Sequence, residues 1–546
     1  LDIIASYIKD TNTVSAVLSN IRTVNMTREF SAIGYALITY TDGNTKYVYA
    51  DNAVTARPST VASELLANNS DLNAEEIAAL EGIVDIAAAN TLNWIDTAYG
   101  SSDAEAMTLR NNIIAAESGN IDSSVYGGTT YYITEENFAE YKSQLSKVPS
   151  GSKVLFKRGG TYRAVSIEVP QNNIYFGAYG EGAKPNIYGS EKNFVNSAWT
   201  NESGNIWYVS DVTVLKKNDA GIVIFDNGKK AGTKKATLAE VTADGDFWYD
   251  SANNRVYLYS EVNPKQAWNS IEIGVNASIF VIDGKKGITV DNLNIRYTGA
   301  HGVSISDASN IKITNCEIGY IGGSYMTHTK NSTVRFGNGV EVWCAGSDII
   351  VDNCWVHQIY DAGLTHQGTA TVKGGSLFTQ KNITFSNNLI EYCALASFEY
   401  WTSASGSAQE YNWFDNIRYT NNICRFAGYG LGTQGVVRTG YHMYTSPEAL
   451  NAITADGQLD TFYVSGNVFD TARGGLMQLA GCHYISALPQ LSGNTYMQKK
   501  GGIIGVLATE FSSGSTSATT NYYADSDAAS VISATFKDTN ANVVVY

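Results

Sequence analysis

Two glutamates and two tryptophans recur at one spacing in short apolar stretches of this chain. The stretches read Gly339-Val-Glu-Val-Trp343 and Ser397-Phe-Glu-Tyr-Trp401. Successive side chains of a β-strand point to opposite faces, so inward Val or Phe residues leave each Glu and the Trp that follows it on the outward face. Carboxylates on such a face can act as acid and base, and indole rings stack on sugar rings. These are the residue types that cleavage of a glycosidic bond requires.

Two further stretches fit the same alternation, Gly302-Val-Ser-Ile-Ser306 and Gly363-Leu-Thr-His-Gln367. The two predicted outward columns are Ser304, Glu341, Thr365 and Glu399, and beside them Ser306, Trp343, Gln367 and Trp401. Strands about 4.8 Å apart put the two Glu residues, two rungs from each other, about 9 to 10 Å apart at the backbone. Inverting glycosidases separate their carboxyl groups by about 6.5 to 9.5 Å and retaining ones by about 5 to 5.5 Å, so the spacing favours inversion. Gln367 is predicted to hydrogen-bond sugar hydroxyls.

Asp361 and His366 are further catalytic candidates. Asp361 precedes its strand at a turn between the two Glu rungs, where it either reaches the groove as acid or base or serves as an Asx-type turn residue. His366 points inward by strict alternation, which predicts a core histidine. A local bulge would instead turn it outward to pair with Asp361 or Glu399.

Long insertions surround these stretches. The outward strand is predicted to continue at 430–434 and 475–479, and insertions at 322–338, 368–380, 402–414 and 436–459 are predicted to wall a pocket. Such a pocket favours an exo-acting or short-oligosaccharide site over an open cleft. The predicted substrate-binding residues are Trp343, Gln367, Trp401, Gln434, Arg438 and His442.

A short phrase that ends in Asn repeats along residues 287–507. Aligning the copies gives one column with Asn292, Asn315, Asn353, Asn387 and Asn421, and a second with Cys316, Cys354, Asn388, Asn422, Asn467 and Asn494. A unit too small to bury its own apolar face must stack on its neighbours, and stacked Asn side chains hydrogen-bond along a ladder. The repeat therefore predicts an all-β parallel solenoid, with longer intervals accommodated by loops.

Composition limits the kinds of partner. The net charge is −15 and no basic stripe occurs, which argues against a nucleic-acid partner. No run of about 18 apolar residues is present, so no membrane span is expected. The six cysteines lie between Cys316 and Cys482 without CxxC spacing, which favours small core residues over a disulfide or metal site. The chain begins without Met or a basic n-region, so we expect a signal peptide upstream in the precursor.

Four regions are predicted. Residues 1–120 form an α+β module with strands at 30–40 and 45–49 and helices near 59–66 and 73–89. Residues 121–150 form a linker and a capping helix. Residues 151–507 form the solenoid with a β-rich insertion at 195–275, and residues 508–546 form a tail or cap. The first module resembles modules of large cell-surface proteins of gut bacteria. That resemblance implies secretion or attachment to a bacterial cell surface, within a larger multidomain protein.

The solenoid resembles right-handed parallel β-helix proteins of the pectate-lyase-like superfamily. The resemblance rests on "VLFKRGGTYR" from Val154 and "FGAYGEGAKPNIYGS" from Phe176. "NGVEVW", "YDAGLTHQG" and "FEYW" resemble segments of bacterial β-helix glycoside hydrolases that act on plant cell-wall or host glycans. This implies Asp361 and Glu399 as acid and base, with Glu341 as third candidate and no cofactor.

Two alternatives stay open. A polysaccharide lyase would act on a uronate-containing polysaccharide and use Ca²⁺ or another cation. A non-catalytic adhesin would bind carbohydrate without cleaving it.

Overall fold

The chain forms two compact units, Leu1–Ile95 and Asp96–Tyr546. In this computed structural model the first unit is described only in six strands and two single residues, 66 and 77. The second unit is described over 103–144, 147–210, 219–326, 334–369, 380–403, 414–431, 440–445, 461–480, 488–508 and 519–546.

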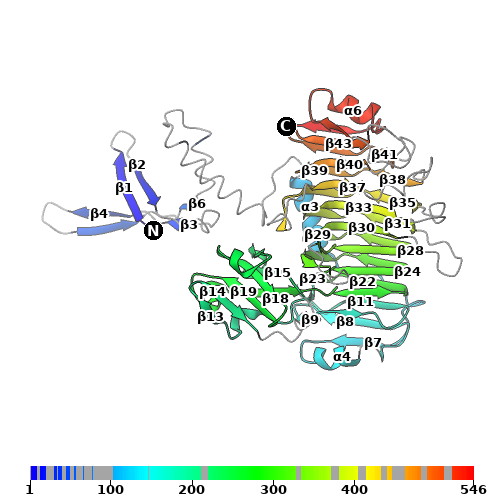
Figure 1. Cartoon of the computed structure of the whole chain (residues 1–546), viewed down its shortest axis with the longest axis horizontal. Coiled ribbons are helices and arrows are strands. Elements are labelled where there is room, and N and C mark those ends of the chain that lie inside the picture. The colour runs from blue at the N-terminus through cyan, green and yellow to red at the C-terminus, as the bar shows by residue number, and fades with distance from the viewer. Residues whose placement is uncertain are drawn as a thin grey trace. The chain divides into compact units, whose positions relative to one another are not determined.

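The second unit is a β-helix whose successive coils add strands to two large sheets (Figure 1). One sheet has 19 strands and the other has ten. The ten are β9 (Thr161–Arg163), β12 (Asn186–Tyr188), β23 (Asn294–Thr298), β25 (Glu317–Ile321), β29 (Trp355–Ile359), β32 (Leu389–Cys393), β36 (Ile423–Ala427), β39 (Val468–Ala472), β42 (Thr495–Gln498) and β45 (Asn542–Val545). Buried Ile, Val and Phe side chains fill the interior. The predicted right-handed parallel β-helix is confirmed.

Asparagines form the predicted ladder at the turn that leads into the ten-stranded sheet. Residues of the first column, such as Asn387 and Asn421, have a positive φ near 55°, a region that Asn tolerates better than most residues. The second column is buried: Asn388 Nδ2 donates to Asn422 Oδ1 over 2.9 Å, and Asn422 Nδ2 donates to Asn467 Oδ1 over 2.9 Å. Each coil therefore satisfies the buried amide of the coil before it.

Helices close both ends of the β-helix (Figure 1). At the first end α4 (Phe138–Gln144) places Phe138 edge-on to Phe156 and Tyr162 of the core, as predicted for a capping helix. At the other end lie α6 (Ala528–Ala534) and β45, and Asp538 Oδ2 accepts from Asn494 Nδ2 over 2.8 Å. The carboxylate thus ends the asparagine ladder.

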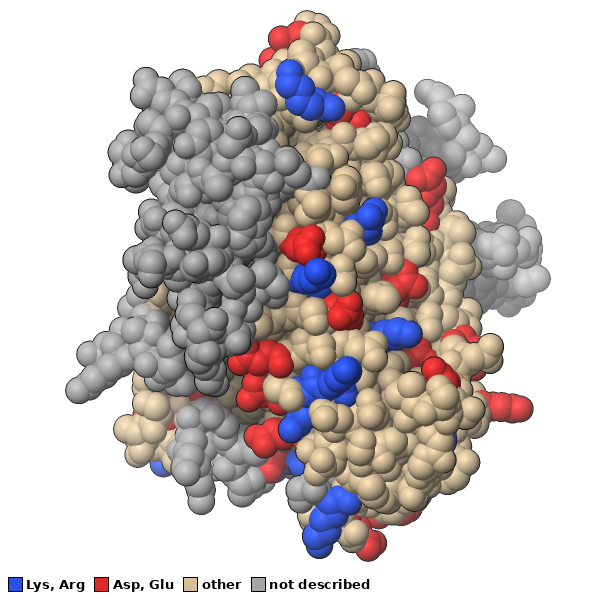
Figure 2. Space-filling model, turned by 90° about the vertical axis from the view of Figure 1, so that its right-hand side faces the viewer, with Lys and Arg blue, Asp and Glu red and all other residues tan. Residues whose placement is uncertain are grey.

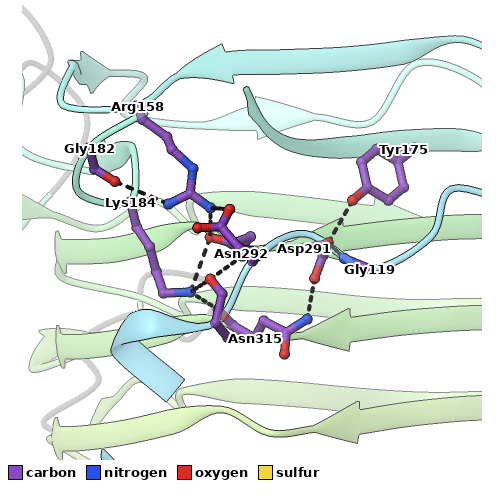
Figure 3. A network of polar contacts seen from close by, with 10 residues as sticks. Gly119, Arg158, Tyr175, Gly182, Lys184, Asp291, Asn292 and Asn315 are labelled. Atoms are coloured by element: carbon purple, nitrogen blue, oxygen red, sulfur yellow. Dashed lines mark hydrogen bonds and ion pairs between the residues drawn. The ribbon is translucent and has the colours of Figure 1, made fainter. Parts of the chain in front are cut away.

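Helix α3 (Asp103–Ala115) and the strap after it, residues 116–119, pack on the β-helix. Ala106 and Ile113 contact Leu389 of β32. The strap residues Ala116 and Gly119 bond to the β-helix. Asn292 Nδ2 donates to the Ala116 carbonyl over 2.6 Å, and the Gly119 N–H donates to Asp291 Oδ2 over 3.1 Å (Figure 3). The module boundary predicted at residue 120 therefore moves to residue 95.

The predicted β-rich insertion forms sheets of five and three strands. Its hairpin joins β18 (Asp246–Asp250) to β19 (Arg255–Tyr259) around Asn254, which has φ 52°. In the first unit, β4 (Tyr35–Thr39) pairs antiparallel with β5 (Thr45–Tyr49), as predicted, while Phe30–Ala32 is a separate strand, β3, paired with β6 (Val54–Ala56). Residues 41–44, between the two predicted strands, and nearly all of the two predicted helices lie outside the described residues.

The charges on one face are mixed (Figure 2), and the described cysteines form no disulfides. Figure 2 shows Lys and Arg interspersed with Asp and Glu on one face of the molecule. All five described cysteines are free, and Cys316 and Cys354 are buried in the ladder column as predicted; Cys482 lies outside the described residues. Among the described helices, none is both long and apolar enough to cross a membrane.

Candidate active site

The predicted site strands lie side by side in the 19-stranded sheet. In order they are β24 (Val303–Thr314), β28 (Val340–Asp352), β30 (Ala362–Thr369), β33 (Ala396–Ser403), β37 (Tyr441–Tyr444) and β40 (Gly475–Gln478). A glycine starts three of the stretches because the backbones approach closely there. A Cβ on Gly339 would lie 2.4 Å from the Gly363 carbonyl oxygen, and one on Gly302 would lie 2.6 Å from that of Gly339. These close contacts help to keep neighbouring coils in register.

The strand register confirms both predicted outward columns. Ser304, Glu341, Thr365 and Glu399 align across β24, β28, β30 and β33, and so do Ser306, Trp343, Gln367 and Trp401. The first column continues with Tyr444 and Gln478. Glu341 and Glu399 are thus two rungs apart, about 9 to 10 Å at the backbone.

Glu341 is a buried carboxylate held by three donors. His301 Nε2 lies 2.9 Å from Oε2, while the side-chain amides of Gln367 and Asn338 donate to Oε1 over 2.9 Å and 3.3 Å. Burial opposes the charged form, but His301 and these hydrogen bonds outweigh it and hold the pKa of Glu341 below its usual range. An ionised carboxylate with this environment is suited to act as a base or nucleophile.

Glu399 occupies the same column on the other side of Thr365. The residue is 7% exposed, as is Glu341. Below it lies the core residue Tyr419, whose pKa is raised first by burial and then by the charge of Glu399. The two carboxylates therefore lie in the same largely buried column of the sheet face, on the two strands that flank the strand of Thr365.

Trp343 and Trp401 stand beside the two glutamates. Their ring centroids are 5.7 Å apart with an interplanar angle of 78°, so the rings meet edge to face across the rung of Gln367. Trp343 is 36% exposed. An accessible indole next to a buried carboxylate is an arrangement that can hold a sugar ring over the acid–base pair.

Asp361 lies at the turn before β30, as predicted, and is half-buried. Its N–H donates to the Gly337 carbonyl over 3.2 Å, and its carbonyl accepts from the Leu395 N–H over 3.1 Å. Four residues of extended strand, about 13 Å, separate its backbone from that of Thr365. Asp361 therefore lies about 13 Å along the strand from the carboxylate column, whereas Glu399 is within it.

His366 is a core residue. It is fully buried, its Nδ1 lies 3.0 Å from Gln380 Oε1 and its Nε2 lies 2.6 Å from the Tyr419 hydroxyl. Strict alternation predicted this inward position, which is confirmed, and no bulge turns the ring outward. Its place among the catalytic candidates was wrong, because both ring nitrogens are occupied inside the coil.

His442 is likewise buried in the core and was wrongly predicted to bind substrate. Its Nδ1 lies 3.0 Å from Ser397 Oγ and its Nε2 lies 2.9 Å from the Asp470 carbonyl oxygen. The next strand to pair with β33 is Tyr441–Tyr444. Leu431, in the stretch predicted to continue the column, instead donates its N–H to Gln358 Oε1 of β29 in the ten-stranded sheet. The strand predicted from Gly475 is confirmed as β40. Gln434, Arg438 and much of the four predicted loops lie outside the described residues.

Because His366 and His442 are buried in the core, we expect the free energy of unfolding to fall in mild acid. Burial lowers the pKa of His366 and of His442 to about 4, against an ordinary value of about 6.5. Between these values the unfolded chain binds more protons, so the free energy of unfolding falls as the pH drops from 7 to 5, by about 2 kcal/mol for each histidine. Urea unfolding at the two pH values measures the loss. His366→Gln should remove about half of the pH dependence, and an unchanged dependence would contradict the burial argument.

Sequence reasoning missed two residues of the site, His301 and Asn338. The Asn338 N–H donates to His301 Nδ1 over 3.1 Å, which leaves the hydrogen on Nε2 to face Glu341. Phe336 packs its ring edge-to-face with His301 at 5.2 Å. Both residues directly precede a glycine that starts a site strand, so extending the aligned columns one position upstream would have found them.

No protein-family model matches the chain. The rhizobactin receptor of Rhizobium meliloti (strain 1021) is 23% identical over 235 residues, 40% of this chain, and the match spans only 29% of the receptor. Solved structures of similar fold include a glycoside hydrolase (10% identical, 69% of this chain and 94% of that chain, TM-score 0.36), an alginate lyase from Paenibacillus sp. str. FPU-7 (9%, 67% and 87%, 0.36) and a polygalacturonase from Erwinia carotovora ssp. carotovora (10%, 72% and 96%, 0.31). The chain is a β-helix protein, and at these identities the similarity concerns the fold alone.

Proposed function

We propose that this protein is an extracellular glycoside hydrolase that cleaves plant cell-wall or host glycans on the outer face of its β-helix. One observation carries the proposal: Glu341 and Glu399 lie two rungs apart in one outward column, with Trp343 and Trp401 in the next. A structural surface has no need to bury two carboxylates beside tryptophans, because burying charge is costly. A carbohydrate site uses both kinds of residue.

The surroundings of Glu341 assign its role, and the role of Glu399 follows as the other carboxylate of the pair. Glu341, held ionised by His301, Asn338 and Gln367, acts as the base. Glu399 then acts as the acid that protonates the departing glycosidic oxygen. The sequence resemblance favours Asp361 as partner of Glu399. The backbone of Asp361 lies about 13 Å along the strand from the column that holds Glu399, so Glu341 is the better candidate, and Asp361→Asn tests the alternative.

A product assay separates this proposal from its alternatives. Purified protein is incubated with a panel of neutral and uronate-containing glycans, with and without EDTA. Hydrolysis predicts new reducing ends, no ultraviolet-absorbing product and no effect of EDTA. An unsaturated product that absorbs in the ultraviolet would identify a lyase, and EDTA sensitivity would support calcium. Binding without turnover across the panel would identify an adhesin.

Trp343 is expected to contribute to substrate binding rather than to the chemical step. Trp343→Ala should raise KM about tenfold, equivalent to about 1.4 kcal/mol, because the sugar loses its stacking surface while the carboxylates remain. Initial-rate kinetics on the cleaved glycan measure this. Tyr132→Ala, which removes a 58% exposed aromatic ring near the capping helix, is the control and should leave KM unchanged. Equal effects of both variants would refute a stacking role.

A further inference from the structure

Thr365 occupies the rung between the two carboxylates. It aligns with Glu341 on one side and with Glu399 on the other, in the column that faces outward. The residue is fully buried, and its Oγ1 has no hydrogen-bond partner. In the neighbouring column, by contrast, the Gln367 side-chain Nε2 has a partner, because it donates a hydrogen bond to Glu341 Oε1.

A buried hydroxyl without a partner destabilises a fold. The cost is about 1 to 3 kcal/mol, so native proteins pair such groups with protein or with water. Valine has nearly the same shape and is at least as favourable in a strand, so stability alone would favour Val at this position. The hydroxyl therefore indicates a partner that is not part of the polypeptide.

We propose that Thr365 Oγ1 holds the water molecule that attacks the sugar, between Glu341 and Glu399; this inference rests on the proposed function. An oxygen above the middle rung is displaced sideways by about one strand spacing, 4.8 Å, from either neighbouring strand, so Glu side chains on both sides can reach it. Thr365 would then be a catalytic residue, because it touches a reacting atom.

The reaction balances with these three residues and water. The water oxygen bonds to the anomeric carbon as one of its protons passes to Glu341. The glycosidic carbon–oxygen bond breaks, and the departing oxygen takes its proton from Glu399. The products are a sugar with inverted anomeric configuration and a free alcohol, after which the proton returns from Glu341 to Glu399 through solvent.

A purely structural alternative predicts different results. If a Glu side chain rotates to accept from Thr365, the hydroxyl stabilises the fold and its loss lowers the melting temperature. If Oγ1 serves a water molecule, Thr365→Val removes an unpaired polar atom, and the melting temperature stays the same or rises.

The test compares Thr365→Val with Thr365→Ser. We expect Val to lower kcat about 10²-fold with KM unchanged within about twofold, and Ser to keep kcat within a few-fold of wild type. The anomeric configuration of the first product, followed by proton NMR, should be inverted. Full activity of the Val variant, a melting temperature several degrees lower, or retained configuration would each overturn the inference.

Failure of the inference can be told apart from failure of the proposed function. If Glu341→Gln abolishes hydrolysis while Thr365→Val does not, the hydrolase assignment stands and the water site is wrong. If Glu341→Gln keeps full activity, the assignment of the site fails, and if the wild type hydrolyses no glycan of the panel, the proposed function itself fails. A crystal structure of the ligand-free protein supplies a readout without activity: we expect a water within hydrogen-bond distance of Thr365 Oγ1 that is missing in the Val variant, and its absence from the wild type would overturn the inference.

Discussion

Glu341→Gln is expected to lower kcat on the cleaved glycan by about 10²- to 10⁴-fold, with a much smaller change in KM. The substitution keeps the shape of the side chain and removes the negative charge that His301, Asn338 and Gln367 surround. Without that charge, residue 341 cannot take a proton from water. Circular dichroism confirms that the variant is folded at the assay temperature.

The matched control for Glu341→Gln is Asp415→Asn. Asp415 is 43% exposed in its side chain and pairs with Lys381 over 3.1 Å elsewhere on the same sheet. Neutralising it changes the net charge of the protein by the same amount and should leave kcat and KM unaltered. A Glu341→Gln variant as active as this control would remove Glu341 from the mechanism.

Asn422→Ala should cost about 3 to 5 kcal/mol of the free energy of unfolding. Asn422 is fully buried; its Nδ2 donates to the Phe385 carbonyl over 2.9 Å and to Asn467 Oδ1 over 2.9 Å, and its Oδ1 accepts from the N–H and Nδ2 of Asn388. Alanine leaves several of these partners buried without a bond. Urea unfolding followed by circular dichroism measures the loss.

Asn421→Gly is the control for the ladder. Asn421 is the exposed neighbour of Asn422 and has φ 56°, a conformation that glycine adopts freely. Its replacement should change the free energy of unfolding by less than about 1 kcal/mol. If both variants lower the free energy of unfolding equally, the hydrogen bonds of the buried Asn column are not what stabilises the ladder.

The sequence predicted those parts of the fold and site that depend on register. The repeated Asn aligned the coils, and period-two alternation then placed Glu341, Thr365 and Glu399 in one outward column, as the strand pairing confirms. The same alternation predicted the inward position of His366. These predictions succeed because one slipped residue would turn every side chain of a strand to the other face.

Errors arose where loops hide the register or where contacts come from distant segments. The stretch at Gly430 has the same pattern as the site strands and was predicted in place of Tyr441–Tyr444, so the inward position of His442 was missed. Helix α3 reaches the β-helix through Ala106 and Ile113, contacts that no local pattern reveals. His301 contributes through a tertiary hydrogen bond to Glu341, 40 residues later in the chain.

The most direct test of the hydrolase assignment is the mass balance of the products of cleavage. Mass spectrometry of a complete digest compares the summed product masses with the mass of the glycan, for wild type and for Glu341→Gln. Hydrolysis adds one water molecule for each bond cleaved, and we predict this addition for the wild type and almost no product for the variant. Products whose masses sum to that of the glycan, or equal cleavage by both proteins, would contradict the account.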